Sequence, residues 1–133
     1  MTFVVDASVA AKWVLPESDS DRAVALRGNG EDMIAPSLIL AEIGNALWKS
    51  AQRGEVSKSD AVRALAAAAA HLTTLVAIDE LAESATALAI DLRHPIYDCF
   101  YLALAQRENA AIITADERML AAARKARIKA RLL

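Results

Sequence analysis

The sequence has one cysteine and few aromatic residues. With only Cys99, the 133-residue chain cannot form an internal disulfide, which is typical of proteins from reducing compartments. Aromatic residues make up 5% of the chain and hydrophobic residues of all kinds 56%. We therefore expect a core of Ala, Leu, Ile and Val, and the length predicts a single domain over residues 1–133.

Long apolar runs and a targeting segment are also missing. No apolar stretch approaches the roughly 18 residues that a membrane span needs. The N-terminus has no charged n-region, and Asp6 interrupts the position where an apolar h-region would lie. We therefore expect no membrane segment and no signal peptide, and together with the lone cysteine this predicts a cytoplasmic location.

A strong charge of one sign is absent too, because the formal net charge is −2. The net charge therefore gives no general argument for binding nucleic acid. The distribution is uneven, since the chain after Glu117 carries six cations and no acid: Arg118, Arg124, Lys125, Arg127, Lys129 and Arg131. Such a basic tail is either a phosphate-binding strip or a solvated helix end whose cations suit the macrodipole.

Short apolar runs alternate with helical patterns along the chain. Strands are predicted at residues 3–6, 32–36, 74–78 and 110–114, with a weak edge strand in the closing "IKARLL". Helices are predicted at residues 6–15, 18–30, 37–54, 57–72, 79–93, 96–109 and 116–127. Strands that alternate with helices predict right-handed crossovers and a parallel sheet covered on both faces, so the fold class is α/β.

Several helix ends carry recognisable signals. Ser37 and Asp79 are predicted to cap their helices, and Gly54 stands where a C′ glycine belongs. Ser57 and Asp60 resemble a capping box in which Asp replaces the usual Glu or Gln. The two helices at 37–54 and 57–72 form a hairpin that departs from a simple doubly wound plan.

Two acids follow predicted strands. Asp6 closes the first strand in "FVVDAS", and Asp116 follows the fourth strand in "IITAD", two residues after Thr114. The carboxyl ends of parallel strands share one edge of the sheet, so these acids can converge although they are far apart in the chain. Each has a simpler interpretation, because Asp is a favoured N-cap.

Two further acids interrupt apolar helix starts. Glu42 breaks the apolar stretch "LILAEIGNALW", with Asn45 three residues later on the same face. Asp98 stands in the first turn of "IYDCFYLALA", where the helix dipole favours a carboxylate. Glu42 could instead be a solvated residue and Asp98 an ordinary first-turn acid.

Four acids at one edge would need a compensating cation. Two unit charges about 4 Å apart repel by roughly 4 kcal/mol at an effective dielectric near 20. No Lys or Arg recurs beside all four acids, and no His/Cys set suits zinc. Mg²⁺ or Mn²⁺ with oxygen ligands fits, and such a site predicts metal-assisted hydrolysis of nucleic acid.

In these motifs the chain resembles the PIN-domain ribonucleases, in particular the toxins of VapBC-type toxin–antitoxin modules. The matching segments are "VVDASV", "LAEIGNAL", "YDCFYLALA" and "IITADERML", whose order and spacing agree over essentially the whole chain. The resemblance implies a three-layer α/β/α sandwich with a parallel sheet of four or five strands. It also implies a Mg²⁺- or Mn²⁺-dependent endoribonuclease, a homodimer, and inhibition by a small antitoxin whose C-terminal segment wraps the toxin.

The resemblance also implies roles for particular residues. Asp6, Glu42 and Asp98 would be the principal metal ligands, and Asp116 would complete the acidic pocket, directly or through water. Ser8, Asn45 and Thr114 would orient ligands or waters around them. His94 lies outside the pattern and is interpreted as structural or exposed rather than as a general base.

Two tryptophans leave alternatives open. Trp13 and Trp48 are either core residues or part of a groove for the antitoxin or for RNA bases. An aspartate-based phosphohydrolase is a rival function, but it needs a second acid where Ser8 stands, and "IITAD" offers no lysine. A catalytically silent binding module is a second rival, against which the full acidic set argues.

Overall fold

Five short strands form one parallel sheet in the centre of the structure. The structure is a computed structural model that describes residues 1–133. The strands are β1 (Thr2–Val5), β2 (Asp32–Pro36), β3 (Thr74–Val76), β4 (Ala111–Thr114) and β5 (Ala130–Leu132). Their order is β3-β2-β1-β4-β5, and Val4 of β1 pairs with Ile34 of β2 on one side and with Ile112 of β4 on the other. All carboxyl ends therefore lie at the same edge of the sheet.

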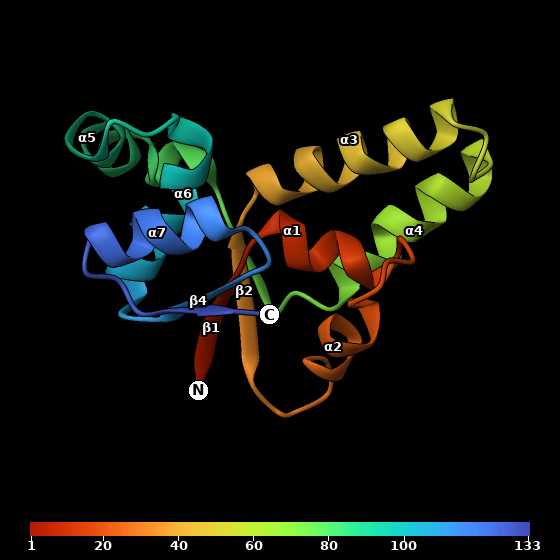
Figure 1. Ribbon diagram of the computed structural model, residues 1–133, viewed down its shortest axis with the longest axis horizontal. Coiled ribbons are helices and arrows are strands. Elements are labelled where there is room, and N and C mark those ends of the chain that lie inside the picture. The colour runs from red at the N-terminus through yellow and green to blue at the C-terminus, as the bar shows by residue number, and fades with distance from the viewer.

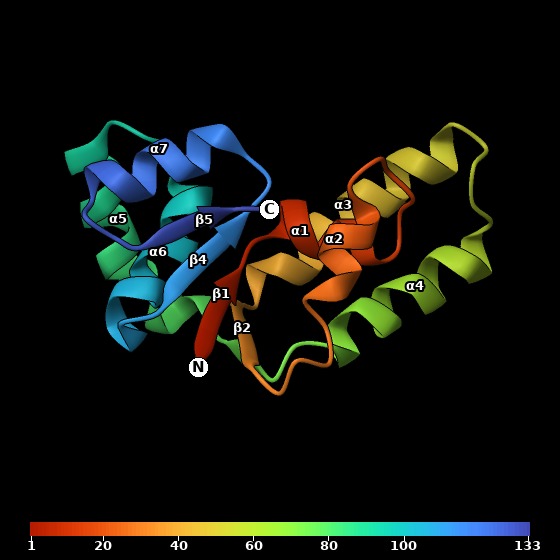
Figure 2. The ribbon, with the colours of Figure 1, turned by 60° about the horizontal axis from the view of Figure 1, so that its bottom comes forward.

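Helices cover the sheet and extend beyond it. They are α1 (Ala7–Ala10), α2 (Ser20–Ala25), α3 (Leu38–Gln52), α4 (Lys58–Ala70), α5 (Ala82–Leu92), α6 (Ile96–Glu108) and α7 (Glu117–Lys125). Helix α6 packs against β1, β2 and β4, and α7 packs against β4 and β5. Figures 1 and 2 show α5, α6 and α7 on one side of the molecule and the α3–α4 hairpin reaching away on the other. None of these helices is both long and apolar enough to cross a bilayer.

Helix α6 lies in the middle of the core. Seven consecutive residues, Cys99 to Ala105, are buried, so the middle of this helix is enclosed on all sides. Asp98 stands at the helix start, just before this run, and remains partly exposed. Burial of the following turns therefore fixes where the backbone of Asp98 lies, while its carboxylate stays partly exposed.

Trp13 belongs to the core. It is 7% exposed, in the 3₁₀ helix Ala11–Trp13, and its Nε1 donates to the carbonyl of Ala23 at 2.9 Å. Trp48 on α3 is 57% exposed. The two tryptophans therefore differ: Trp13 is a core residue, and Trp48 is available on the surface.

Most predicted elements are present, but several boundaries were wrong. The helix predicted at 18–30 spans only Ser20–Ala25, and the one predicted at 6–15 is α1 followed by the 3₁₀ helix Ala11–Trp13. The third strand ends at Val76 instead of residue 78, and α5 begins at Ala82 instead of residue 79. A 3₁₀ helix, Ile78–Glu80, occupies the difference, and Asp79 caps nothing. The cause is a long-range contact, because Ser37 donates its N–H to the Val76 carbonyl at 2.7 Å and its Oγ accepts from the Ile78 N–H at 3.3 Å.

The predicted caps had mixed outcomes. Because its Oγ is used in that contact, Ser37 makes no capping hydrogen bond to α3. Ser57 does cap α4, and its Oγ accepts from the Asp60 N–H at 3.2 Å, while the Asp60 carboxylate binds Arg63. Gly54 follows α3 with a φ of 74°, a conformation that glycine adopts without strain. The predicted edge strand is β5.

Candidate functional site

Asp6 lies at the carboxyl end of β1 and is 4% exposed. It caps α1, because its Oδ1 accepts from the N–H groups of Ser8 at 2.9 Å and Val9 at 3.3 Å and from the Ser8 hydroxyl. Its Oδ2 accepts from Thr114 Oγ1 at 2.5 Å. Burial raises the pKa of Asp6 against the lowering effect of these hydrogen bonds. Asp6 is thus a helix cap and also a desolvated carboxylate held in one orientation.

Ser8 and Thr114 join the ends of β1 and β4. The Ser8 Oγ accepts from the Ala115 N–H at 2.9 Å, and Thr114 Oγ1 accepts from the Asp116 N–H at 3.0 Å. Asp116 is the N-cap of α7, since its Oδ1 accepts from the Arg118 N–H at 2.8 Å. The predicted pair of strand-end acids is therefore linked through Thr114, although the Asp116 carboxylate itself faces the start of α7.

Glu42 and Tyr101 form a second contact at the same edge. The Tyr101 hydroxyl, which belongs to a 1% exposed side chain, donates to Glu42 Oε1 at 2.6 Å. Burial raises the pKa of Glu42, and so do the negative charges of Asp98 and Asp6. Burial also raises the pKa of Tyr101 well above its ordinary range, with a further contribution from Glu42. Glu42 thus lies close enough to both Asp6 and Asp98 for their charges to act on it.

His94 contacts the third of these acids. Its Nε2 lies 2.6 Å from Asp98 Oδ2, and the two side chains are 13% and 30% exposed. The sequence did not suggest a role for His94 or Tyr101 in the site. Helical spacing could not indicate either role, because His94 precedes α6, which begins at Ile96, and Tyr101 contacts Glu42 of α3.

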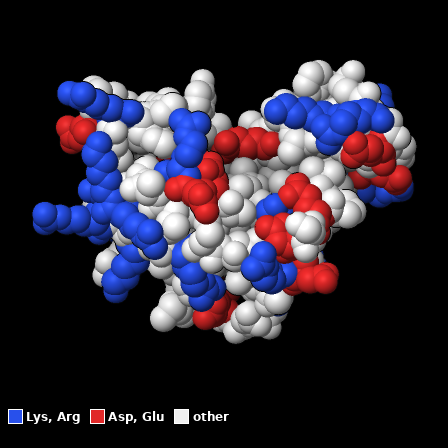
Figure 3. Space-filling model, in the orientation of Figure 1, with Lys and Arg blue, Asp and Glu red and all other residues white.

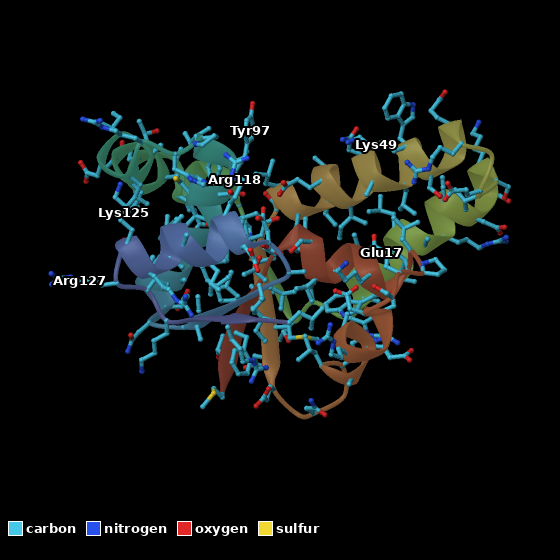
Figure 4. The ribbon with its side chains drawn as sticks, in the orientation of Figure 1. Glu17, Lys49, Tyr97, Arg118, Lys125 and Arg127 are labelled. Atoms are coloured by element: carbon cyan, nitrogen blue, oxygen red, sulfur yellow. The ribbon has the colours of Figure 1, made fainter.

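A groove runs beside the acids between α1 and α3. It has a volume of about 530 Å³ and is lined by residues that include Ser8, Glu42, Asn45 and Tyr97. Asn45 is exposed on the same wall as Glu42, and Figure 4 shows Tyr97 at the start of α6 with its hydroxyl pointing outward into solvent. In the space-filling view, acidic atoms gather in the middle of this face (Figure 3). The groove gives an extended ligand access to Glu42.

The donor set suits a hard divalent cation. The oxygens of Asp6, Glu42 and Asp98 carry mutually repelling charge, and no Lys or Arg forms an ion pair with any of them. Lys12, which also lines the groove, is paired with Glu17 and Asp19. Oxygen ligands of this kind are preferred by Mg²⁺ and Mn²⁺.

The side chains do not form a ready-made cage. Nowhere do three or more His, Cys, Asp or Glu side chains surround one point closely enough to hold a metal ion. Glu42 and Asp98 are only half-buried, so both carboxylates have room to rotate. The site therefore fits a divalent cation in its chemistry, and binding would require these side chains to adjust.

A parallel sheet with carboxylates gathered at its carboxyl edge defines an α/β protein with an acidic site of the kind used by metal-dependent hydrolases. Residues 3–125 match the model of the PIN domain family, and the chain belongs to this family. This finding confirms the resemblance and the three-layer α/β/α sandwich predicted from the sequence.

Named relatives extend over most of the chain. Ribonuclease VapC3 of Pyrobaculum aerophilum is 30% identical over 121 residues, which cover 90% of this chain and 92% of that protein. Ribonuclease VapC9 of Mycobacterium tuberculosis is 32% identical over 116 residues, 87% of each chain. The crystal structure of VapBC2 from Rickettsia felis, bound to a DNA fragment from its promoter, superposes with a TM-score of 0.71. At 15% identity over 100% of this chain and 99% of that one, it supports the fold alone.

Proposed function

We propose that this chain is a Mg²⁺- or Mn²⁺-dependent endoribonuclease that acts as the toxin of a type II toxin–antitoxin module, within one PIN domain over residues 1–133. Its relatives VapC3 and VapC9, 30% and 32% identical to this chain, are named ribonucleases. The observation that carries the proposal is the convergence of Asp6, Glu42 and Asp98 from three separate elements, with no Lys or Arg among them.

The acids would bind the cation, and neighbouring side chains would orient the acids through hydrogen bonds. We assign Asp6 and Asp98 as metal ligands, with Glu42 and Asp116 acting directly or through water. A bound Mg²⁺ or Mn²⁺ lowers the pKa of a coordinated water and offsets charge that develops on the phosphodiester. Without such an ion, ionised carboxylates would repel a phosphate, so substrate binding and metal binding are coupled.

The chain's own contribution is orientation. Thr114 and Ser8 fix the two oxygens of Asp6, Tyr101 fixes one oxygen of Glu42, and His94 fixes one oxygen of Asp98. Each donor leaves part of its carboxylate free to bind a cation. Asn45, on the exposed wall beside Glu42, would orient a water or the substrate.

Partners follow from the same site. We propose RNA as the substrate. We propose the cytoplasm as the place where the chain acts. An antitoxin segment would occupy the groove that Glu42 and Tyr97 line, with a basic side chain directed at the carboxylates. We also propose that two copies of this chain form a homodimer.

The decisive experiment compares cleavage of a labelled single-stranded RNA by the wild type and two aspartate variants. Asp98→Asn should abolish cleavage, and Asp21→Asn, a matched change at an exposed aspartate of α2, should leave it intact. Chelation should stop the wild-type reaction, and Mg²⁺ or Mn²⁺ should restore it.

Two results would contradict the proposal. Equal cleavage by wild type and Asp98→Asn, after contaminating nuclease has been excluded, would remove the acids from the reaction. No binding of Mg²⁺ or Mn²⁺ in calorimetry, together with no cleavage, would favour a PIN-fold binding module without catalytic activity.

A further inference from the structure

A second groove begins next to the acidic site and runs along α7. It has a volume of about 270 Å³ and is lined by Leu92, His94, Arg118, Ala121, Ala122 and Lys125. The four residues from α7 have the spacing of a single helix face, with two alanines between two cations. His94, at one wall, also contacts Asp98 of the acidic site. The groove therefore adjoins that site at His94.

The cations of this groove are free to bind an anion. Neither Arg118 nor Lys125 forms an ion pair, whereas Lys12, Arg53, Arg63 and Arg107 elsewhere in the chain are paired with acids. Lys125 Nζ donates to the Leu92 carbonyl at 3.5 Å, which uses one of its three donors. Arg118 makes no side-chain hydrogen bond.

The surroundings of the groove are also basic. Arg93, Arg124, Arg127 and Lys129 are exposed and unpaired nearby in the sequence, and Lys and Arg dominate the α7 side of the molecule in Figure 3. Figure 4 shows Arg118 and Lys125 at the two ends of α7 toward α5 and α6, while Arg127 points outward. An acidic protein thus carries a group of cations without ion pairs beside its proposed site.

We infer that this α7 groove holds the sugar-phosphate backbone of the RNA strand on one side of the bond that is cut. The inference rests on the ribonuclease function proposed above. Seven residues of helix separate Arg118 from Lys125 by roughly 10 Å, enough for more than one phosphate. Because Ala121 and Ala122 have small side chains, the sugar-phosphate backbone of RNA can approach both cations.

Charge complementarity favours RNA over an uncharged ligand, and the groove's position favours RNA over an unrelated anion. An RNA strand bound at the acids must extend beyond that site on each side of the bond that is cut. Because carboxylates repel its phosphates, a path lined by cations is favourable. The groove's cations would bind without base contacts, so we expect them to act on all sequences alike.

The test measures binding of a short fluorescein-labelled single-stranded RNA by anisotropy at several salt concentrations in Mg²⁺ buffer. The parent protein is Glu42→Gln, which lacks one proposed metal-holding charge but keeps an acceptor for Tyr101, so binding is read without cleavage. Arg118→Gln and Lys125→Gln should each reduce the slope of log affinity against log salt by about 0.7, and the double variant by about 1.4. Lys125→Arg should restore the slope.

Lys49→Gln is the matched control, because Lys49 is an exposed lysine on α3 that forms no ion pair and lies away from α7 in Figure 4. Unchanged slopes in both groove variants would overturn the inference, and so would an equal loss in Lys49→Gln, which would indicate a net-charge effect. A poly-glutamate peptide that competes as well as RNA would assign the groove to an acidic protein segment. If wild type never cleaves RNA, the proposed function fails, but these binding slopes still decide the inference.

Discussion

Replacing Thr114 by valine tests the hydrogen bonds that join β1 to β4. The side chain is fully buried, its hydroxyl donates to Asp6 Oδ2 at 2.5 Å, and the same oxygen accepts from the Asp116 N–H at 3.0 Å. Valine keeps the shape and removes both contacts. A hydrogen bond to a charged group contributes about 1.5–3 kcal/mol, and a buried donor left unpaired costs about 1–3 kcal/mol.

Asp116 is only half-buried, so water can satisfy part of its N–H, and the added methyl contributes about 0.8 kcal/mol in favour of folding. We therefore expect Thr114→Val to lower the free energy of unfolding by about 2–4 kcal/mol. This is a large share of the roughly 5–15 kcal/mol typical of a domain. Cleavage should fall as well, because Asp6 loses the donor that orients its second oxygen.

Urea unfolding followed by circular dichroism measures this change, with Thr114→Ser as the control. Serine keeps the hydroxyl and removes one buried methyl, so its cost should be about 1 kcal/mol and its cleavage close to wild type. If valine is as stable as the wild type, or if serine costs more than valine, the hydroxyl is not what holds the two strand ends together.

Tyr101→Phe should reduce the initial rate of cleavage about 10-fold or more, because Glu42 loses its orienting donor. The free energy of unfolding in urea should fall by only about 1–2 kcal/mol. Unchanged initial rates would contradict this role. Burial and two neighbouring carboxylates raise the pKa of Glu42 above its ordinary 4.5, so the unfolded chain ionises first as pH rises. In metal-free buffer the free energy of unfolding should therefore fall from about pH 4.5 upward until Glu42 ionises in the folded state, and Glu42→Gln should remove that part of the fall. Trp13→Ala should cost about 3–5 kcal/mol in thermal unfolding, whereas exposed Trp48→Ala should stay within about 0.5 kcal/mol; equal effects would refute the difference in burial.

The parallel sheet was predictable because each strand is a short apolar run followed by a helical pattern. The same pattern located Asp6 and Asp116 at the carboxyl edge before any coordinates were known. It also gave two rival interpretations of Asp6, a helix cap and an acid of the site, and the contacts of Asp6 are compatible with both. Asp6 caps α1 and is also desolvated beside other carboxylates. A capping residue at a strand end can thus belong to a functional site.

Features that depend on distant contacts were not predictable. Ser37 carries the sequence signal of an N-cap, but its hydroxyl bonds to Ile78 because β2 and β3 are neighbours in the folded sheet. Tyr101 reads as one more apolar residue of α6, and only the packing of α6 beside α3 shows that its hydroxyl reaches Glu42. Local spacing cannot supply either pairing, because each joins residues about 40 to 60 positions apart.

The contact between Asp6 and Thr114 joins the beginning of the chain to a point near its end, 108 positions later. During synthesis Asp6 leaves the ribosome well before Thr114, because 108 positions separate the two residues. A nascent or prematurely terminated product that stops before β4 has the first three carboxylates but lacks the strand that aligns them. For a nuclease that attacks RNA, this topology would delay competence until β4 has been made, because Asp6 lacks its Thr114 contact before then.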